Sequence, residues 1–298
     1  MPELNARQLR AVTAVAEYRS FVAAAAHLGI SQPALTLSIR RLEEILGLAL
    51  FIRTTRQVTL TAAGREFVLM AERVLNDLSR GMRSLQELSD RHRGHVTVAS
   101  LITLRMSLVV AEYSRRFPGV EIELREGFED DVKEDVRGGV ADFGLGYIGE
   151  LPSSHTIEGL SIETLRVVLR RDHSLADARQ VAFEELKDTA LVSLPTRSRA
   201  RRLIDAAATS AGFALRHAVT VGLPLTLFNL VSSGAGVAVV PGGPPPLPAF
   251  KHLVSRALVK PSLSSEVGIM HLRDRGLSPA AAGLLALTRE RLRAQSLG

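Results

Sequence analysis

Cysteine is absent from this chain of 298 residues, and lysine is scarce. Without thiols, the protein can form no disulfide and no thiolate metal site, and it has no cysteine nucleophile. Only 4 lysines stand against 33 arginines, so genome composition explains part of the formal net charge of +6. The charge alone is therefore a weak indication of a polyanionic partner.

The sequence also lacks the motifs of common enzymes. It contains no Walker A loop, no H-E-x-x-H and no G-x-S-x-G, and its 8 histidines are scattered without the spacing of metal ligands. We therefore expect no catalytic residues, no cofactor and no metal. An enzyme with a regulatory module is the weakest of the functional hypotheses.

Two stretches bear on where the protein works. The first thirty residues carry charged residues from Glu3 onward, which break the apolar core of a signal peptide, so we expect a cytosolic protein. Residues 217–250 contain no Asp, Glu, Lys or Arg, which on length alone would allow a membrane span. Prolines and an asparagine interrupt that stretch, and the pattern favours a buried strand, helix and strand instead.

Two short helices joined by a tight turn are predicted within the first fifty residues. Ser20 is placed as the N-cap of a helix over 21–28, Gly29 allows the turn, and Ser31 is the N-cap of a second helix over 32–46. This is the helix-turn-helix arrangement, whose second helix enters the major groove of DNA. Residues 50–60 then alternate apolar and polar across a basic turn, which predicts a β-hairpin wing.

Residues 21–64 carry a family resemblance. The segment FVAAAAHLGISQPALTLSIRRLEEILGLALFIRTTRQVTLTAAG resembles the helix-turn-helix and wing of LysR-type transcriptional regulators, including SQPA at the second helix, the following RLEE, LF-x-R at the wing and LTAAG at the next helix. One position departs from the family pattern, because Leu37 stands where many relatives have arginine. A helical hairpin without a DNA role is the alternative, and it leaves the coincidence of these motifs unexplained.

The resemblance implies that six residues bind DNA, namely Ser31, Gln32, Pro33, Thr36, Arg53 and Arg56. The chemistry agrees: Gln32 can pair with adenine, Thr36 can meet a thymine methyl, and the two arginines can bind phosphate or a narrowed minor groove. Ser31 could donate to phosphate, although capping its helix is the simpler role.

A long helix over 62–89 is predicted next. Apolar and small residues recur at alternating spacings of four and three, at Phe67, Ala71, Val74, Leu78, Gly81, Leu85 and Leu88. A stripe of this length needs a partner, and the resemblance favours a homodimer whose two recognition helices read half-sites related by a dyad. Packing of the stripe onto its own domain remains the alternative, because the stripe contains small residues.

The chain is predicted to divide into a winged helix-turn-helix domain (1–61), a linker and dimerisation helix (62–92) and an effector-binding domain (93–298). In the last, β-rich runs alternate with helical runs, which indicates a parallel sheet with crossover helices. The expected architecture is a bilobal, periplasmic-binding-protein-like α/β domain, with lobe 1 at about 93–165 and 266–298 and lobe 2 at about 166–265. RRFPGVEIELREG, VADFGLG, RDHSLA and LVSSGAGVAVVP resemble landmarks of the LysR effector domain.

The cleft between the two lobes is the expected ligand site, because ligands of open α/β sheets bind beyond the carboxyl ends of the strands. The N–H groups at the helix that follows Ser100 suit an anionic group, and Arg197 is the expected partner of a carboxylate or sulfonate. The resemblance implies a pocket lined by Ser100, Ile102, Thr103, Phe128, Tyr147, Thr196, Arg197 and Leu223. The alternatives are that Ser100 and Thr103 cap a helix, Phe128 belongs to the core and the arginines form a solvated face.

These features predict a LysR-type regulator that binds double-stranded promoter DNA under the control of a small, anionic organic effector. By resemblance it contacts RNA polymerase and works as a homodimer or homotetramer. A cytosolic small-molecule receptor without DNA function is the second hypothesis. The sequence leaves open the effector, the target genes and whether transcription is activated or repressed.

Overall fold

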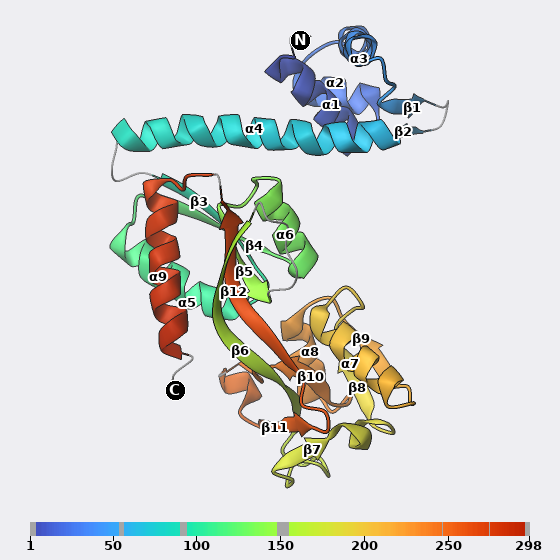
Figure 1. Cartoon of the computed structure of the whole chain (residues 1–298), viewed down its shortest axis with the longest axis vertical. Coiled ribbons are helices and arrows are strands. Elements are labelled where there is room, and N and C mark those ends of the chain that lie inside the picture. The colour runs from blue at the N-terminus through green and yellow to red at the C-terminus, as the bar shows by residue number, and fades with distance from the viewer. Residues whose placement is uncertain are drawn as a thin grey trace. The chain divides into compact units, whose positions relative to one another are not determined.

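The computed structural model describes residues 4–53, 57–89, 94–147, 155–245, 247–273 and 275–295. The chain forms two compact units, the first made of Met1–Gly94 with Arg137–Val140 and the second of His95–Val136 with Ala141–Gly298 (Figure 1). The hydrophobic cores follow this division, because one cluster of buried residues lies within the first unit and four lie within the second.

The first unit is a three-helix module with a two-stranded hairpin and a long helix. Its elements are α1 (Ala6–Tyr18), α2 (Phe21–Leu28), α3 (Gln32–Leu46), β1 (Phe51–Arg53), β2 (Val58–Leu60) and α4 (Ala62–Ser89). The predicted caps are confirmed: the Ser20 hydroxyl accepts from the Ala23 amide, the Ser31 hydroxyl accepts from the Ala34 amide, and Gly29 ends α2 with φ of 66°. Any other residue would be strained at this positive φ, so glycine at position 29 is what allows the tight turn.

The core of this module forms where the three helices meet the wing and the start of α4. Leu35, Ile39 and Leu42 bury one face of α3 completely, against α1 residues such as Val12 and Val15. The opposite face of α3 is left to solvent, as the helical period requires.

The second unit is built on a mixed sheet with the strand order β4-β3-β5-β12-β6-β11-β7, to which β10 is added through β6. The elements of its first lobe are β3 (Gly94–Ser100), α5 (Thr103–Arg116), β4 (Val120–Glu126), α6 (Glu129–Arg137), β5 (Phe143–Tyr147), β12 (Ser264–Leu272) and α9 (Pro279–Gln295). Strands β3 and β5 are parallel, whereas β12 runs antiparallel to both of its neighbours. The expected parallel pairing is therefore confirmed for β3 and β5, whereas for β12 it is wrong.

One strand, β6 (His155–Arg170), links the two lobes (Figure 1). Its residues up to Thr164 pair with β12, and from Leu165 onward they pair with β10 and β11 of the second lobe. Thr164 stands opposite Ser264, the first residue of β12, so both crossings between the lobes lie side by side.

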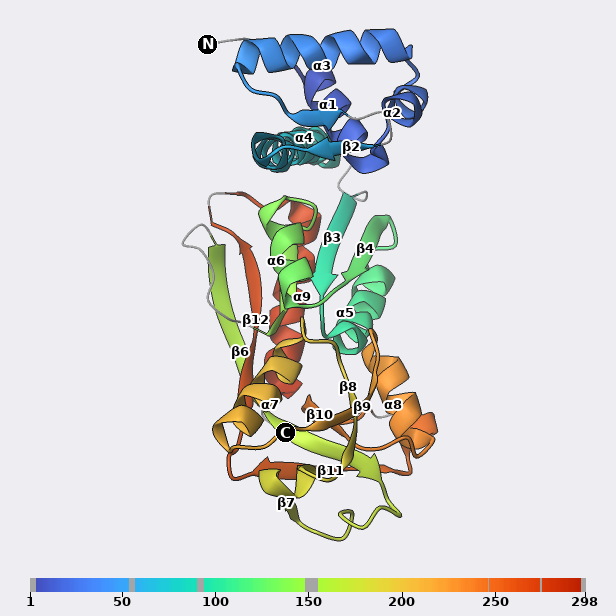
Figure 2. The same ribbon diagram turned by 90° about the vertical axis from the view of Figure 1, so that its right-hand side faces the viewer.

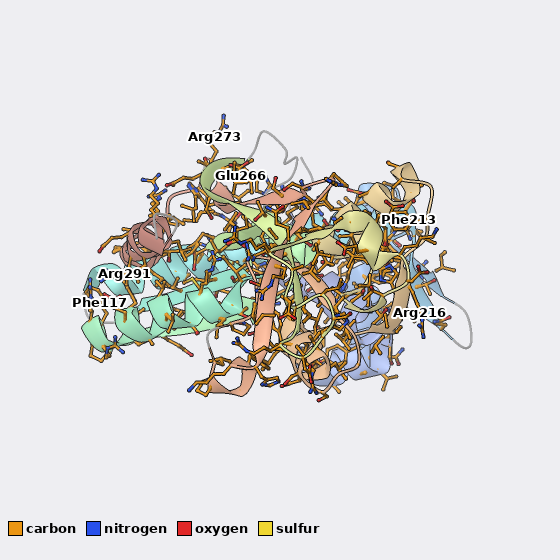
Figure 3. The ribbon with its side chains drawn as sticks, turned by 90° about the horizontal axis from the view of Figure 1, so that it is seen from below. Phe117, Phe213, Arg216, Glu266, Arg273 and Arg291 are labelled. Atoms are coloured by element: carbon orange, nitrogen blue, oxygen red, sulfur yellow. The ribbon has the colours of Figure 1, made fainter. Side chains whose placement is uncertain are left out.

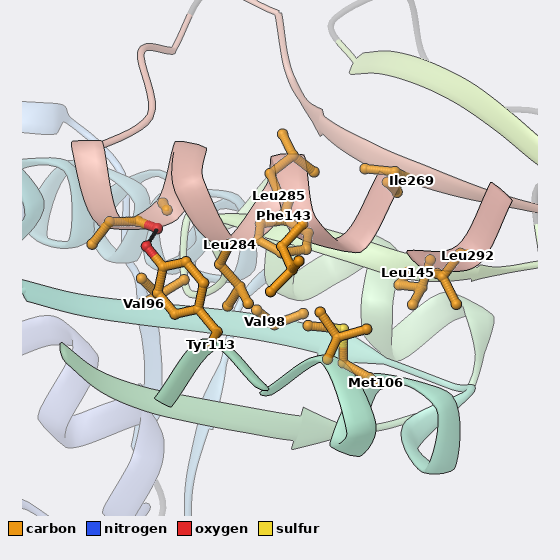
Figure 4. Close-up of a cluster of buried hydrophobic side chains, with 14 of the residues drawn as sticks. Val96, Val98, Met106, Tyr113, Phe143, Leu145, Ile269, Leu284, Leu285 and Leu292 are labelled. Atoms are coloured by element: carbon orange, nitrogen blue, oxygen red, sulfur yellow. Dashed lines mark hydrogen bonds between the residues drawn. The ribbon is translucent and has the colours of Figure 1, made fainter. Parts of the chain in front are cut away.

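Helices cover both faces of the first lobe's sheet. Helices α5 and α9 bury one face, where the Tyr113 hydroxyl donates to the Ala280 carbonyl at 2.9 Å inside a cluster that includes Phe143 and Ile269 (Figure 4). Helix α6 covers the other face through Val132 and Val136. At the rim, the guanidinium of Arg291 on α9, labelled in Figure 3, makes hydrogen bonds of 2.7 and 2.6 Å with the Glu112 carboxylate of α5.

The second lobe places helices on opposite sides of a small set of strands (Figure 2). Its elements are β7 (Gln180–Ala182), η1 (Phe183–Leu186), β8 (Ala190–Ser193), α7 (Arg199–Ser210), β9 (Arg216–Thr220), α8 (Pro224–Ser232), β10 (Ala238–Pro241), η2 (Pro248–Phe250) and β11 (Leu253–Val259). Along β10, Val239 joins the core under α7, while Ala238 and Val240 join the core under α8. The uncharged stretch 217–250 thus forms the predicted strand, helix and strand.

Candidate functional site

The N-terminal end of α3 is exposed, while its middle is buried. Gln32 and Pro33 are exposed on the first turn, and Leu35 is fully buried one turn further. Two of the three side chains to which the resemblance assigns base contacts, Gln32 and Pro33, therefore lie on the surface. The Ser31 hydroxyl is engaged with the Ala34 amide at 3.4 Å, which is the capping role.

Two further residues of α3 refine this face. The Thr36 hydroxyl oxygen is fully buried and has no hydrogen-bond partner among the described residues, so any exposed part of that side chain is hydrocarbon. This favours contact with a thymine methyl over a polar contact. Leu37 is 48% exposed, so the position that departs from the family pattern lies on the surface.

The backbone at the start of the wing is contacted by α3 and by α4, and these contacts explain two of the sequence motifs. The carboxylate of Glu43 accepts hydrogen bonds from the amides of Leu50 and Phe51 at 2.8 and 3.2 Å. On α4, a Cβ on Gly64 would lie 2.0 Å from the Leu50 carbonyl oxygen, so only glycine allows the helix to approach this closely. The two glutamates of the RLEE motif are Glu43 and Glu44, and the first of them contacts the wing. The glycine of the LTAAG motif is Gly64.

The hairpin itself pairs Arg53 with Val58. The side chain of Arg53 and all of Arg56 lie outside the described residues. Their predicted contacts with DNA therefore remain predictions.

The apolar stripe of α4 is divided between two roles. Phe67 and Ala71 are 8% and 0% exposed, because they pack into the core of their own module. Val74, Leu78 and Leu85 are 44%, 49% and 64% exposed. The expected dimer seam is thus wrong for Phe67 and Ala71, and the exposed part of the stripe begins at Val74. The side chain of Leu88 lies outside the described residues.

A cleft of about 100 Å³ lies between the lobes of the second unit. It is lined by Ser100, Leu101, Thr103, Glu126, Gly127, Phe128, Asp131, Arg197, Gly222, Leu223 and Pro224. Ser100 ends β3 and is fully buried, and its hydroxyl accepts from the Ile102 amide at 3.2 Å. Thr103 is the first residue of α5, whose N-cap, Ile102, provides no side-chain hydrogen bond. The N-cap side chain therefore satisfies none of the first N–H groups of α5, and Thr103 on this turn lines the cleft.

Arg197 reaches across this cleft from the second lobe. Its guanidinium carbon lies 4.4 Å from the centre of the Phe128 ring, and Nη1 lies 3.2 Å from the Asp131 carboxylate. The same Asp131 oxygen accepts from the Phe128 amide at 2.9 Å. The predicted charge partner for a ligand is thus already paired with a carboxylate of the protein itself.

The comparisons with known proteins agree with this architecture. The family model described as "Bacterial regulatory helix-turn-helix protein, lysR family" matches residues 6–65, and "LysR substrate binding domain" matches residues 89–293. The chain belongs to the LysR family. It is 32% identical over 291 residues to the HTH-type transcriptional regulator YfeR of Shigella flexneri, covering 95% of this chain and 93% of that protein.

Two further similarities point the same way. The HTH-type transcriptional regulator YbhD of Escherichia coli (strain K12) is 30% identical over 282 residues, covering 94% of this chain and 89% of that protein. The crystal structure of CbnR, a LysR family transcriptional regulator, has a TM-score of 0.67 at 22% identity and covers 97% of this chain and 99% of that chain. At this identity the likeness shows the fold, with its helix-turn-helix module and α/β effector-binding domain.

The structure of this LysR protein brings five of the expected effector residues to the cleft, namely Ser100, Thr103, Phe128, Arg197 and Leu223. The other three lie elsewhere. Ile102 packs against the core of the first lobe, Thr196 is exposed on the loop before α7, and Tyr147 is buried at the end of β5.

Tyr147 belongs to a polar cluster next to the crossing strands. Its hydroxyl donates to the Glu163 carboxylate at 3.3 Å, and Arg105 forms an ion pair with the same carboxylate. Burial, followed by the neighbouring negative charge of Glu163, raises the pKa of Tyr147 well above its ordinary value. At neutral pH the phenol is therefore a hydrogen-bond donor.

A hydrogen-bonded row of Ser193, His217 and Asp205 connects three elements of the second lobe, and sequence spacing did not reveal it. The Ser193 hydroxyl lies 2.7 Å from His217 Nδ1, and His217 Nε2 lies 2.9 Å from Asp205, which also pairs with Arg201. Ser193 is only 5% exposed, so the row serves to tie β8, β9 and α7 together ahead of the loops that line the cleft.

Membrane and metal features were also sought among the described residues. No single helix there has the length and apolar composition to cross a membrane, and the pair α2 and α3 passes that test only when the two are taken together across a bend of 104°. The same residues contain no group of three or more His, Cys, Asp and Glu side chains that could hold a metal ion.

Proposed function

We propose that this LysR-family protein regulates transcription by binding dyad-symmetric promoter DNA through α3 and its wing, with a small organic effector bound between the lobes. The observation that carries the DNA part is the exposure of Gln32 and Pro33 at the end of a helix whose other face is fully buried. A helix held in this way can enter the major groove with its N-terminal residues forward. A structure of CbnR in complex with its target DNA supports the same use of this module.

The test is binding to the DNA upstream of the protein's own gene across a salt series. Gln32→Ala should weaken specific binding by about 1–3 kcal/mol and leave binding to random DNA unchanged, because it removes a base contact. Arg53→Ala should weaken both and flatten the salt slope by about one unit, because it removes a phosphate contact. The matched control is Gln180→Ala, which removes an exposed glutamine on β7. Equal binding by all four proteins would instead favour a small-molecule receptor without DNA function.

The quaternary part of the proposal is a homodimer through α4. Val74, Leu78, Met82 and Leu85 expose apolar surface over about 16 Å of helix, a length that a second copy of α4 can cover. Two recognition helices would then face two half-sites. A tetramer needs a second surface, and Leu108 on α5, 63% exposed, is a candidate for it. We further infer that the protein acts in the cytoplasm and contacts RNA polymerase.

The effector part of the proposal is a small ligand with an anionic group. Thr103 and the first turn of α5 offer donors for such a group, and Arg197 offers a guanidinium once it leaves Asp131. A thermal-shift screen of small organic acids tests this, since a ligand that binds the folded protein raises its unfolding temperature. Thr103→Val should abolish the shift that the wild type gives, whereas Thr209→Val, on the exposed side of α7, should not.

A further inference from the structure

The first turn of α6 makes two contacts with the second lobe. Glu129 lies on this turn and is 2% exposed, and its Oε1 accepts a hydrogen bond from the backbone amide of Arg199 at 3.1 Å. Asp131, two residues further, holds Arg197. Residues 197 and 199 flank Ser198, the N-cap of α7. The first lobe thus contacts the N-terminal end of α7, a helix of the second lobe.

The Glu129 contact replaces a cap that α7 lacks. Ser198 stands at the N-cap position but its side chain makes no capping hydrogen bond. A carboxylate at a helix N-terminus satisfies a free N–H group and interacts favourably with the helix dipole. Glu129 supplies this from the other lobe. The amide of Arg199, the first residue of α7, therefore has its acceptor on the first lobe.

The Glu129 contact is buried, whereas the Asp131 contact is exposed. Burial raises the pKa of Glu129, opposed by hydrogen bonds from its own amide and from that of Arg199. The second carboxylate oxygen of Glu129 is buried without a hydrogen-bond partner among the described residues. Loss of the hydrogen bond from the Arg199 amide would therefore leave a buried carboxylate unsatisfied, which is costly. The Asp131–Arg197 pair is about half exposed on both sides and contributes little by itself.

A neighbouring acid shows that these contacts are specific. Asp130 lies between Glu129 and Asp131 on the same turn, is 68% exposed and faces Lys133 of its own helix at 3.9 Å. All three acids favour the N-terminus of α6 through its dipole, but only Glu129 and Asp131 reach the second lobe.

We propose that the first turn of α6 is a latch that fastens the two lobes to each other, with Glu129 capping α7 and Asp131 holding Arg197 against Phe128. Resting on the proposed use of the cleft as an effector site, the latch also defines how an anionic effector acts. The anionic group takes the place of Asp131 on Arg197, one negative charge for another. Glu129 remains on α7 and serves as the pivot about which the second lobe shifts.

The latch is tested first without any ligand, by hydrogen–deuterium exchange of the full chain over residues 196–203. Glu129→Ala removes the cap and should speed exchange of this segment about tenfold. Glu129→Gln keeps an acceptor oxygen and should exchange like the wild type, and Asp130→Ala is the matched control for the helix dipole. Unchanged exchange in Glu129→Ala, or equal acceleration in Asp130→Ala, would overturn the latch.

The exchange of charges is tested with malonate as the probe. Asp131→Asn keeps the acceptor for the Phe128 amide but releases Arg197, so malonate should bind this variant several-fold more tightly than the wild type. Asp130→Asn should bind like the wild type. Equal affinities of Asp131→Asn and the wild type, weaker binding by the variant, or no binding by either would overturn the exchange. DNA binding through α3 is measured separately, so either proposal can fail while the other stands.

Discussion

The Glu43 carboxylate lies 2.8 Å from the amide nitrogen of Leu50, and this contact joins the recognition helix to the first residues of the wing. It is a charge-assisted hydrogen bond in a part-buried site, and the same oxygen also accepts from the Phe51 amide. A single side chain of α3 therefore accepts both amide hydrogen bonds at the start of the wing.

Replacing that side chain should loosen the wing. Glu43→Ala leaves two amides without their acceptor and should lower the unfolding free energy by about 1–3 kcal/mol, measured by urea denaturation. Glu44→Ala is the control, because Glu44 makes an exposed pair with Arg40, for which the expected loss is at most about 0.5 kcal/mol. Equal losses in the two variants would show that Glu43 does not hold the wing.

Local signals in the sequence were enough to predict the helix-turn-helix module. Ser20, Gly29 and Ser31 act within a few residues of their own positions, so their roles could be read from spacing alone. The first half of β6 has no strand pattern of its own, because its polar and glycine-containing run forms a strand only by pairing with β12, about a hundred residues away. A parallel sheet was expected, and the antiparallel direction of β12 could not be read from its sequence because it depends on the same distant pairing.

The position of the cleft could be predicted from the sequence, but the internal partners of its arginines could not. Ser100 and Thr103 follow the end of a strand, which is where such sites form. The contacts of Arg197 with Asp131 and of Arg199 with Glu129 span 66 and 70 residues of sequence. No pattern in the neighbourhood of either arginine indicates an internal partner, so Arg197 was expected to be free for a ligand.

The row of Ser193, His217 and Asp205 predicts a pH dependence of stability. Burial, with Arg201 nearby, lowers the pKa of His217 in the folded protein, although Asp205 opposes this. The unfolded chain therefore takes up the proton more readily. The stabilisation is complete above the ordinary histidine pKa of about 6.5 and is lost as the pH falls below it.

The measurement is the unfolding temperature between about pH 8 and about pH 5.5, on either side of the ordinary histidine pKa. The wild type should lose more stability across this range than His217→Gln, which has no group to protonate at this position. His252→Gln, which changes an exposed histidine of the same unit, should follow the wild type. A His217→Gln protein with the wild-type slope would rule out this histidine as the cause.

The exposed stripe of α4 predicts the behaviour of the dimer. Leu78→Glu places a charge in the middle of the proposed seam and should shift the protein from dimer to monomer in light scattering, because a buried unpaired charge costs several kcal/mol. Ser79→Glu adds the same charge about 100° around the helix and should leave the dimer intact. Dissociation by both substitutions, or by neither, would argue against a seam at Leu78.

The packing of α9 on α5 offers a test of the core by a double-mutant cycle. A Cβ on Gly283 would lie 2.6 Å from the Tyr113 hydroxyl oxygen but 3.4 Å from the nearest ring carbons. Gly283→Ala should therefore be destabilising by about 1–3 kcal/mol through overpacking, although alanine favours a helix. Tyr113→Phe alone should cost about 1 kcal/mol, because it removes the hydrogen bond to Ala280.

The two substitutions together should not add. With phenylalanine at position 113 the oxygen that obstructs the new methyl group is gone, and the remaining contacts of 3.4 Å are ordinary packing distances. In that background Gly283→Ala should become neutral or stabilising, by up to about 1 kcal/mol, since the helix propensity of alanine is then unopposed. Additive losses in chemical denaturation would mean that the clash involves the ring or the backbone rather than the hydroxyl, because only a contact shared by the two residues produces a coupling energy.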